Sequence, residues 1–233
     1  MVTNAEIKQI RALREKKFRD EYGLFVVEGE KMVREALDSG MEVVKVLRTE
    51  EIGEQVMAKI SMFSTPSPVL AVVRKPQTLI PEIGQGIYLA LDSVRDPGNI
   101  GTIIRTADWF GVKAIFASQD SVDIYNPKVI QATMGAIFRC PVVYSDIPEV
   151  CRRFKASGMP VYGTFLDGAD IYDAALSKAG LIVMGNESNG ISPAVGAEVD
   201  SRLLIPRAEG SRAESLNVAT ATAITLSIFA RTK

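Results

Sequence analysis

Residues 87–205 contain six short, almost entirely apolar segments that alternate with segments of helical pattern. These segments are Ile87–Leu91, Ala114–Ala117, Val142–Tyr144, Pro160–Thr164, Leu181–Met184 and Arg202–Ile205. Strands of a parallel sheet are covered on both faces by their connecting helices, so they read as continuous apolar runs. The pattern therefore predicts an α/β fold with a parallel sheet. Ligands of such sheets bind in the loops that follow the carboxyl ends of the strands.

The N-terminal part carries a smaller α/β pattern. Residues 3–19 have apolar side chains at helical spacing beside six cations, which are Lys8, Arg11, Arg14, Lys16, Lys17 and Arg19. Strand patterns at 24–27, 43–47 and 69–73 and helical patterns at 30–37 and 50–60 complete this unit. A stretch rich in proline and glycine at 75–86 is typical of a linker. We therefore divide the chain into a domain of residues 1–82 and a domain of residues 83–233.

The chain of 233 residues contains no histidine. This excludes Ser-His-Asp and Cys-His catalysis, histidine zinc sites and the usual general base at neutral pH. The two cysteines, Cys140 and Cys151, are too few for a tetrahedral thiolate site and do not resemble a secreted disulfide framework. We expect both to be reduced and partly buried, and we expect no metal centre.

The charges nearly balance, with 27 Lys and Arg against 28 Asp and Glu. No global field draws such a protein onto a polyanion, so any nucleic-acid surface must be a local patch. No apolar run approaches the roughly 18 residues of a membrane span, and the first residues lack the apolar core of a signal peptide. We expect a cytoplasmic protein without a membrane partner.

Three polar loops follow the predicted strands, and the first spans residues 91–101. It runs from an apolar strand through Pro97 and Gly98 into a helix, for which Asn99 suits the N-cap. Arg105 lies one or two turns further along, so both side chains can face one cleft. The alternatives are a structural turn with a solvated arginine and a backbone clamp of the KH type at Gly98-x-x-Gly101.

The second loop, residues 183–193, has glycines at the separation of a P-loop. The position after Gly190 is Ile191 instead of lysine, which argues against hydrolysis of a nucleoside triphosphate. What remains is a backbone nest with one carboxylate, Glu187, suited to a small polar ligand. The alternative is a structural turn with a solvated glutamate.

The third loop leads from the strand at 202–205 into a helix rich in alanine and threonine. Ser215 suits the N-cap of this helix. Its small side chains allow close packing against another backbone, in this chain or in a partner. The fingerprint G-x-G-x-x-G of dinucleotide-binding folds is absent.

Taken in order, the three loops resemble the motifs of the SpoU (TrmH-type) RNA 2′-O-ribose methyltransferases of the SPOUT superfamily. The matching stretches are Asn99-x-Gly101-x-x-x-Arg105-Thr106-Ala107, Gly185-x-Glu187-x-x-Gly190, and Ile205-Pro206 followed by Ser215-Leu216-Asn217-Val218. The N-terminal part resembles the small RNA-binding domain that precedes the catalytic domain in rRNA-modifying members. Its matching stretches are Lys16-Lys17-x-Arg19, Gly23-x-Phe25-x-Val27-Glu28-Gly29 and Glu35-Ala36-Leu37.

The resemblance implies an α/β fold whose C-terminal domain is tied in a deep trefoil knot, and an obligate homodimer. It implies S-adenosyl-L-methionine as the cofactor and RNA, in particular a nucleotide of 23S-type rRNA, as the substrate. The residues expected to contact the cofactor are Thr164, Phe165, Leu166, Gly185, Asn186, Ile205, Ser215 and Leu216. The family's catalytic and substrate-positioning residues correspond to Asn99, Arg105, Glu187, Ser215 and Asn217. The six N-terminal cations are expected to contact RNA.

The family's arginine is proposed to act as a base, but a guanidinium loses its proton only with great difficulty. We therefore expect Arg105 to grip phosphate and to polarise the ribose hydroxyl. Compared with the family motif, the loop between Pro206 and Ser215 is about two residues longer and has Arg207 in place of the usual methionine. Two alternative functions stay open, a tRNA methyltransferase of the same family and a non-catalytic dimeric RNA-binding scaffold.

Overall fold

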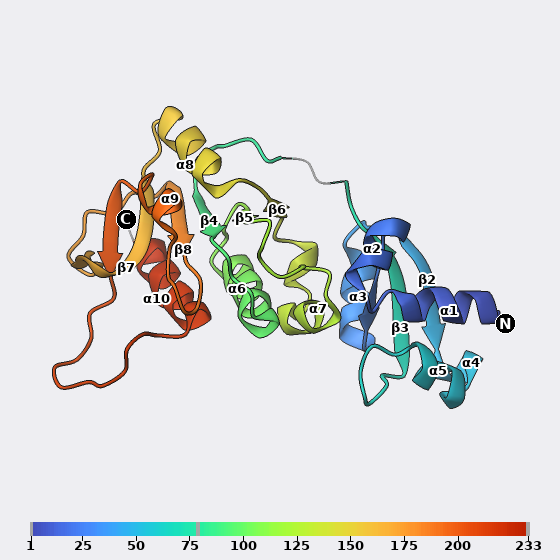
Figure 1. Cartoon of the computed structure of the whole chain (residues 1–233). Helices are drawn as coiled ribbons and strands as arrows, with labels where there is room; N and C mark the ends of the chain where they lie inside the picture. Colours follow the sequence, from blue (N-terminus) through green and yellow to red (C-terminus); the bar gives the residue numbers. More distant parts are fainter. Residues whose placement is uncertain (1, 78–79, 232–233) are drawn as a thin grey trace. The chain divides into compact units, whose positions relative to one another are not determined.

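The computed structural model describes residues 2–77 and 80–231, which form two compact units (Figure 1). The first unit comprises residues 2–77 and 123–139, and the second comprises residues 80–122 and 140–231. These units are defined by packing in space. The division of the sequence into domains between residues 82 and 83 stays a prediction. None of the helices in the described ranges is long and apolar enough to cross a membrane.

The first unit is built on a three-stranded antiparallel sheet in the order β1-β3-β2. The strands are β1 (Leu24–Glu28), β2 (Val43–Arg48) and β3 (Val69–Arg74). The helices are α1 (Asn4–Ala12), α2 (Lys16–Tyr22), α3 (Glu30–Asp38), α4 (Thr49–Ile52), α5 (Glu54–Ile60), α7 (Pro127–Thr133) and the short 3₁₀ helix η1 (Ala136–Phe138). Side chains alternate across β1, so Val26 packs with α1 and α5 on one face. Phe25, its neighbour in the strand, packs on Tyr125 with ring centroids 4.8 Å apart.

Two predicted helices of this unit are each divided in two. The basic segment at 3–19 forms α1 and α2, because the guanidinium of Arg19 donates hydrogen bonds to the carbonyl oxygens of Leu13 and Arg14. Those carbonyls would otherwise accept from the next helical turn. The acidic segment at 50–60 breaks between α4 and α5 at Gly53, whose φ is +81°.

The second unit contains a six-stranded sheet in the order β6-β5-β4-β8-β7-β9, and all of its pairings are parallel. The strands are β4 (Ile87–Leu91), β5 (Ile115–Ala117), β6 (Val142–Tyr144), β7 (Val161–Asp170), β8 (Gly180–Met184) and β9 (Ser201–Leu204). The helices are α6 (Pro97–Trp109), α8 (Ile147–Ala156), α9 (Pro193–Gly196) and α10 (Val218–Arg231). The predicted parallel α/β sheet is therefore confirmed.

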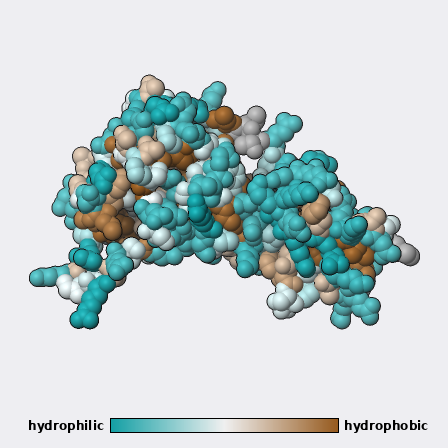
Figure 2. Space-filling view, in the orientation of Figure 1, coloured by the Kyte–Doolittle hydropathy of each residue, from teal (hydrophilic) through white to brown (hydrophobic). Residues whose placement is uncertain are grey.

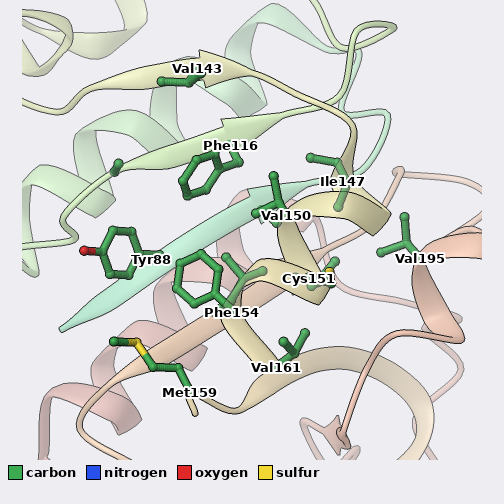
Figure 3. Packing of buried hydrophobic residues seen from close by; sticks show 14 of the residues in the cluster. Tyr88, Phe116, Val143, Ile147, Val150, Cys151, Phe154, Met159, Val161 and Val195 are labelled. Atoms are coloured by element: carbon green, nitrogen blue, oxygen red, sulfur yellow. The ribbon is translucent and has the colours of Figure 1, made fainter. Parts of the chain in front are cut away.

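Helices cover both faces of this sheet. On one face, α8 packs Phe154 against Tyr88 and Phe116 of the strands (Figure 3). On the opposite face, Phe229 of α10 meets Tyr162, with the ring centroids 5.0 Å apart. Helix α6 packs beside α10. Burial on both faces explains why strands such as β8 are completely buried along their length.

The chain reverses its order across the sheet between β4 and β8. From β4 it continues to β5 and β6 on one side, whereas β7, β8 and β9 lie on the other side. In open parallel sheets, ligands bind outside the carboxyl ends of the strands at such a switch point. The loops that follow β4 and β8 are the first and second polar loops of the sequence. The sheet thus brings together the segments in which we predict the chemistry.

The third polar loop connects β9 to α10 and is exposed at every residue from 206 to 217. Figure 1 shows this segment as a wide excursion of the chain, and Figure 2 shows hydrophilic side chains projecting there. Inside the loop, Nη1 of Arg207 donates a hydrogen bond of 3.0 Å to the carbonyl oxygen of Ala213. The longer loop predicted from the sequence is therefore a polar, solvent-facing segment.

Candidate active site and nucleic-acid interface

A chain of side-chain hydrogen bonds joins the three polar loops. Asn217 Nδ2 donates to Asn99 Oδ1 at 2.8 Å, and Asn99 Nδ2 donates to Glu187 Oε1 at 3.0 Å. These contacts span 118 and 88 residues of sequence. Three of the five predicted catalytic residues are therefore in direct contact. Each asparagine has a fixed amide orientation in this chain, because a flipped amide would place two acceptors or two donors together.

Glu187 is the acceptor at the centre of this arrangement. Besides Asn99, it accepts hydrogen bonds from the backbone N–H groups of Asp96, at 3.2 Å, and Arg95, at 3.4 Å. Partial burial opposes ionisation of the carboxyl, but the hydrogen bonds from Asn99 and from the backbone outweigh it, so the pKa of Glu187 lies below its ordinary value. The carboxylate therefore ties the loop after β8 to the loop after β4.

The helix caps differ from those that we predict. Asp96 caps α6 by accepting from the N–H of Asn99 at 2.8 Å, and Pro97 follows as its first residue. Asn217, not Ser215, lies directly before α10 and accepts from the N–H groups of Ala219, at 2.9 Å, and Thr220, at 3.3 Å. The Asn217 side chain thus caps a helix with its oxygen and holds Asn99 with its nitrogen.

A cleft of about 480 Å³ opens beside the two asparagines, between α6 and α10. Its lining consists of small and hydroxylated residues, namely Asp96, Gly98, Asn99, Thr102, Thr106, Asn217, Ala219, Thr220 and Ala223. Arg105 lies exposed on α6, between the two lining threonines of that helix. The structure gives its guanidinium no hydrogen bond or ion pair to another described residue. It is available to a ligand that reaches this surface.

The loop after β8 is folded tightly on itself. A Cβ atom at Gly185 would lie 2.2 Å from the carbonyl carbon of Gly190 and 2.3 Å from the nitrogen of Ile191. Asn186 Nδ2 donates to the carbonyl oxygen of Ser93 at 2.7 Å, and its Oδ1 accepts from two N–H groups of its own loop at 3.0 Å. Asn186, predicted as a cofactor contact, therefore supports the loop with both ends of its amide.

Thr164, Phe165 and Leu166, which we predict to contact the cofactor, lie where strand β7 begins to bulge. Pairing with β9 shifts between Thr164 and Ala169, so the residues between them stand out from the ladder. Leu166 in this bulge is 74% exposed. The guanidinium of Arg202, in β9, lies 3.5 Å from the centre of the Phe165 ring and pairs with Asp167 at 2.5 Å. Arg202 therefore clamps the bulge from the neighbouring strand.

The other predicted cofactor residues lie in the third loop or at its start. Ile205 is half-buried directly after β9, whereas Ser215 is exposed and Leu216 is 48% exposed. Ser215 does not take part in the hydrogen-bonded chain of Asn217, Asn99 and Glu187. The structure thus brings the ends of β7, β8 and β9 together as neighbouring strands, while Ser215 and Arg105 face solvent.

Further polar residues, outside the predicted site, shape the loop after β4. Asp92 is 6% exposed and accepts from the N–H of Ser192 at 2.7 Å. Ser93 has a φ of +60°, and its hydroxyl donates to Asp120 at 2.6 Å. Asp120 also pairs with Arg95 at 2.8 Å, and these hydrogen bonds hold the pKa of its carboxyl well below the ordinary value. The useful signal is a run of polar residues directly after a buried strand.

Five of the six predicted RNA-contacting cations are exposed on α1, α2 and the turn between them, namely Lys8, Arg11, Arg14, Lys16 and Lys17. Arg19 is instead 2% exposed and forms an ion pair of 2.6 Å with Asp123. It therefore lies outside the exposed basic surface on which we place it, because its guanidinium is held by an acid and two carbonyl oxygens within the unit.

Both cysteines are free and buried, Cys140 at 2% and Cys151 at 0% exposure. Burial raises the pKa of each thiol to about 12. Neutral, buried thiols are inert at physiological pH, so they belong to the hydrophobic core rather than to the site.

Comparison with known proteins places this geometry in a family. Residues 86–227 match the SpoU rRNA Methylase family, and residues 4–54 match the MRM3-like substrate binding domain. A 23S rRNA (guanosine(2553)-2′-O)-methyltransferase, RlmP of Bacillus subtilis, is 33% identical over 95% of this chain and 94% of its own length.

Two solved structures show the same fold over the full length. A structure described as a putative RNA methyltransferase of the TrmH family from Porphyromonas gingivalis superposes with a TM-score of 0.92 at 39% identity, covering 100% of both chains. An AdoMet-bound rRNA methyltransferase from Sinorhizobium meliloti superposes with a TM-score of 0.88 at 34% identity, covering 99% of this chain and 96% of its own. From the motifs, the parallel sheet and these relatives, we conclude that this chain belongs to the SpoU rRNA methylase family and carries an N-terminal substrate-binding domain of the MRM3-like type.

Proposed function

We propose that this protein methylates the ribose 2′-oxygen of a nucleotide in 23S rRNA, with S-adenosylmethionine as methyl donor. One observation carries the proposal. The hydrogen-bonded chain from Asn217 through Asn99 to Glu187 joins the three family motifs at the switch point of the sheet. The RlmP relative, which is similar over 95% of this chain, supports the choice of 23S rRNA.

The ends of β7, β8 and β9 have the chemistry that S-adenosylmethionine requires. They offer an exposed apolar side chain at Leu166 and a tight glycine turn at Gly185 where only backbone can approach, and the loop from β9 to α10 adds an exposed Leu216. We propose that Thr164–Leu166, Gly185, Ile205 and Leu216 hold the cofactor. When bound, S-adenosylmethionine supplies a methyl group on a positively charged sulfur. The AdoMet-bound relative from Sinorhizobium meliloti supports the identity of the cofactor.

The hydrogen-bonded chain acts through position rather than through proton transfer. Glu187 is ionised at neutral pH and accepts four hydrogen bonds, one of them from Asn186 of its own loop, so it fixes the N-terminal turn of α6 beside the loop after β8. Asn99 and Asn217 line the cleft between α6 and α10. We propose that the target ribose binds along this cleft, where the threonine hydroxyls can meet its own hydroxyls. Holding the reacting groups in place supplies a large part of such a catalytic effect.

Arg105 is the cation that we assign to the substrate at this cleft. Its guanidinium is exposed on α6 and can grip a phosphate of the target nucleotide. From there its charge favours the ionised form of the ribose 2′-hydroxyl, whose proton leaves to water as the oxygen gains the methyl group. An Arg105→Ala variant should lose methyl transfer and keep cofactor affinity. Near-normal turnover would refute this role.

We also propose that the protein is a homodimer and that its second unit is tied in a trefoil knot, as the family resemblance implies. Trp109, the last residue of α6, is 84% exposed, and α6 packs beside α10, whose first two turns consist mainly of small residues. Buried tryptophans are common in the centres of stable interfaces. A Trp109→Glu variant should therefore sediment as a monomer. If the variant sediments as a dimer like the wild type, Trp109 is not part of the dimer interface.

Calorimetry distinguishes this function from that of a non-catalytic RNA-binding scaffold. The enzyme should bind S-adenosylmethionine with micromolar affinity, whereas a scaffold should release no binding heat. Transfer of a labelled methyl group to an unmodified 23S rRNA transcript, in parallel with a pool of unmodified tRNA transcripts, then separates the two enzymatic alternatives. Label in the tRNA alone would contradict the proposed substrate.

A further inference from the structure

The first compact unit contains a segment from far along the sequence. Residues 123–139 lie within the stretch that matches the SpoU rRNA Methylase family, yet they pack on the N-terminal sheet and helices. Helix α7 of this segment lies against β1, and Tyr125 packs on Phe25. At the end of the segment, Arg139 forms an ion pair with Glu35 of α3. The unit that carries the basic residues is therefore completed by this segment.

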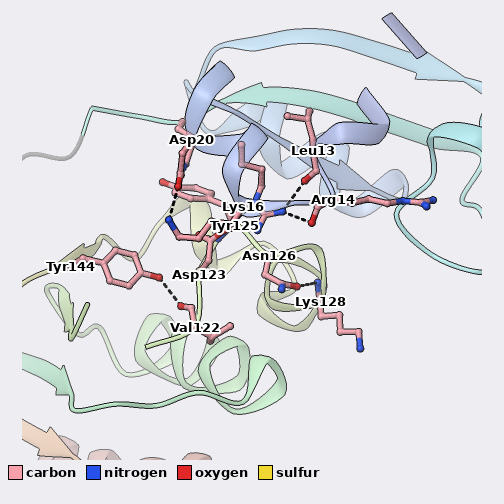
Figure 4. A network of polar contacts seen from close by, with 12 residues as sticks. Leu13, Arg14, Lys16, Asp20, Val122, Asp123, Tyr125, Asn126, Lys128 and Tyr144 are labelled. Carbon is pink, nitrogen blue, oxygen red and sulfur yellow. Dashed lines mark hydrogen bonds and ion pairs between the residues drawn. The ribbon is translucent and has the colours of Figure 1, made fainter. Parts of the chain in front are cut away.

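A buried ion pair joins Asp123 of the segment to Arg19 of α2. Figure 4 shows Asp123 near Leu13 and Arg14, the residues of the turn between α1 and α2. Asp123 Oδ2 accepts from Arg19 Nε at 3.0 Å and from Nη2 at 2.6 Å. The side chain of Arg19 is 2% exposed and that of Asp123 is 8% exposed. The remaining guanidinium nitrogen, Nη1, donates to the carbonyl oxygens of Leu13, at 2.8 Å, and Arg14, at 2.7 Å. One guanidinium thus joins an acid of the segment to the backbone between α1 and α2.

The backbone held in this way is the turn that presents the basic residues. Arg14 lies in the turn, and Lys16 and Lys17 begin α2 directly after it; all three are exposed. Phosphate contacts require these cations to stand at fixed positions along a polyanion, and a turn in one conformation presents them without further ordering cost. Arg19 itself is too deeply buried to touch a phosphate.

We infer that Asp123, acting through Arg19, positions the turn between α1 and α2 as part of the RNA-contacting surface. RNA affinity then depends on a buried acid from the segment at 123–139, although that acid repels phosphate. Asp123 and Arg19 are positioning residues, and Arg14, Lys16 and Lys17 make the contacts. This inference rests on the RNA contact proposed above for the first unit.

The sign of one substitution tests the inference. Asp123→Asn removes a negative charge, so electrostatics alone predicts tighter binding of RNA. If Asp123 positions the turn, the variant should bind more weakly because the turn loses its fixed conformation. We expect a rise in Kd of about three- to tenfold for an unmodified 23S rRNA transcript. The matched control is Asp20→Asn, which removes an exposed acid of α2 that pairs with Lys16 and with Lys75, each at 2.5 Å. It should leave Kd unchanged or lower it.

The salt dependence of binding separates positioning from a purely structural role. Each phosphate contact contributes about 0.7 to 0.9 to the slope of log K against log salt concentration. Arg19→Lys conserves the charge but cannot bridge Asp123 and both carbonyl oxygens. The magnitude of the slope should therefore fall by at least about 0.7 to 0.9, the contribution of one phosphate contact. Measurements are made below the unfolding midpoint of each variant, as monitored by circular dichroism. A folded Arg19→Lys variant with an unchanged slope would refute positioning.

The outcomes also separate this inference from the proposed function. If the wild-type protein shows no salt-dependent affinity for the transcript, the RNA contact of the first unit fails and the inference falls with it. If the wild type binds while folded Asp123→Asn binds equally well or more tightly, the inference alone is wrong. Weaker binding by Asp123→Asn together with unweakened binding by Asp20→Asn supports it.

Discussion

Replacing Asn217 by aspartate separates the two tasks of its side chain. Aspartate caps helices as well as asparagine does, so the contacts to the N–H groups of Ala219 and Thr220 survive. The carboxylate cannot donate, however, and the 2.8 Å contact to Asn99 Oδ1 becomes a contact between two acceptors. Rotation of the Asn99 amide would relieve this contact but would place its oxygen against Glu187.

The size of the effect follows from these contacts. Loss of a neutral hydrogen bond costs about 1 kcal/mol, and at this exposed contact an acceptor left without a donor adds about 1–2 kcal/mol, the lower part of the range for buried groups. A total of about 2–3 kcal/mol in the transition state corresponds to a loss of about 30- to 150-fold in kcat/KM. The assay measures transfer of labelled methyl from S-adenosylmethionine to an unmodified 23S rRNA transcript.

Asn217→Ala is the matched variant, because it removes both the cap and the link. Loss of a cap costs about 1 kcal/mol, which lowers the unfolding midpoint of a chain of this size by about 2–4 °C. Asn217→Asp keeps the cap and loses only the link to Asn99, so its midpoint should lie about 2–4 °C above that of Asn217→Ala. Wild-type kcat/KM for Asn217→Asp would show that the link between the asparagines is irrelevant to the reaction. Equal destabilisation of both variants would show that Asn217 is not the cap.

Three further predictions address the loops. The pKa of Glu187 is lower in the folded than in the unfolded protein, where it is near 4.5, so its carboxylate stabilises the fold above that pH. This stabilisation is lost as the pH falls through the folded value, so the stability of Glu187→Gln should depend less steeply on pH below about 4.5. An unchanged pH dependence of unfolding in the variant would contradict this. Gly185→Ala should abolish binding of S-adenosylmethionine in calorimetry, because the added Cβ would collide with backbone atoms. The control Gly196→Ala, whose Cβ would lie 3.7 Å from Phe165, should bind the cofactor normally. Cofactor binding by Gly185→Ala would refute the importance of the tight turn. Arg202→Lys should raise the Kd for S-adenosylmethionine about two- to tenfold by releasing the Phe165 ring, and an unchanged Kd would separate the clamp from the cofactor site.

The sheet of the second unit was predictable because its strands are buried on both faces. Strands β4 and β6 have the bounds that the apolar runs predict. Strand β7 extends to Asp170 instead of Thr164, because the chain rejoins β9 after a bulge. The bulge contains Asp167 and Gly168, which read as loop residues. A strand that resumes after a bulge leaves no apolar run to recognise.

The residues of the site could be predicted from the sequence, but the role of each residue could not. Asn99 and Ser215 suit an N-cap, yet Asp96 and Asn217 perform that task. The Asp96-Pro97 pair carries the stronger signal, because proline favours the first turn of a helix directly after its cap. Arg19 has the residue type and the neighbours of a phosphate contact. Its partner is 104 residues away in the sequence, and no local pattern can reveal such a contact.

The central claim is that this chain methylates a ribose of 23S rRNA. The most direct test incubates the purified protein with S-adenosylmethionine and an unmodified 23S rRNA transcript, digests the RNA to nucleosides and identifies the methylated product by mass spectrometry. We expect one nucleotide to gain a methyl group on its 2′-oxygen, and Arg105→Ala to form none. Methylation on a base instead of the ribose, or equal methylation by Arg105→Ala, would contradict the account.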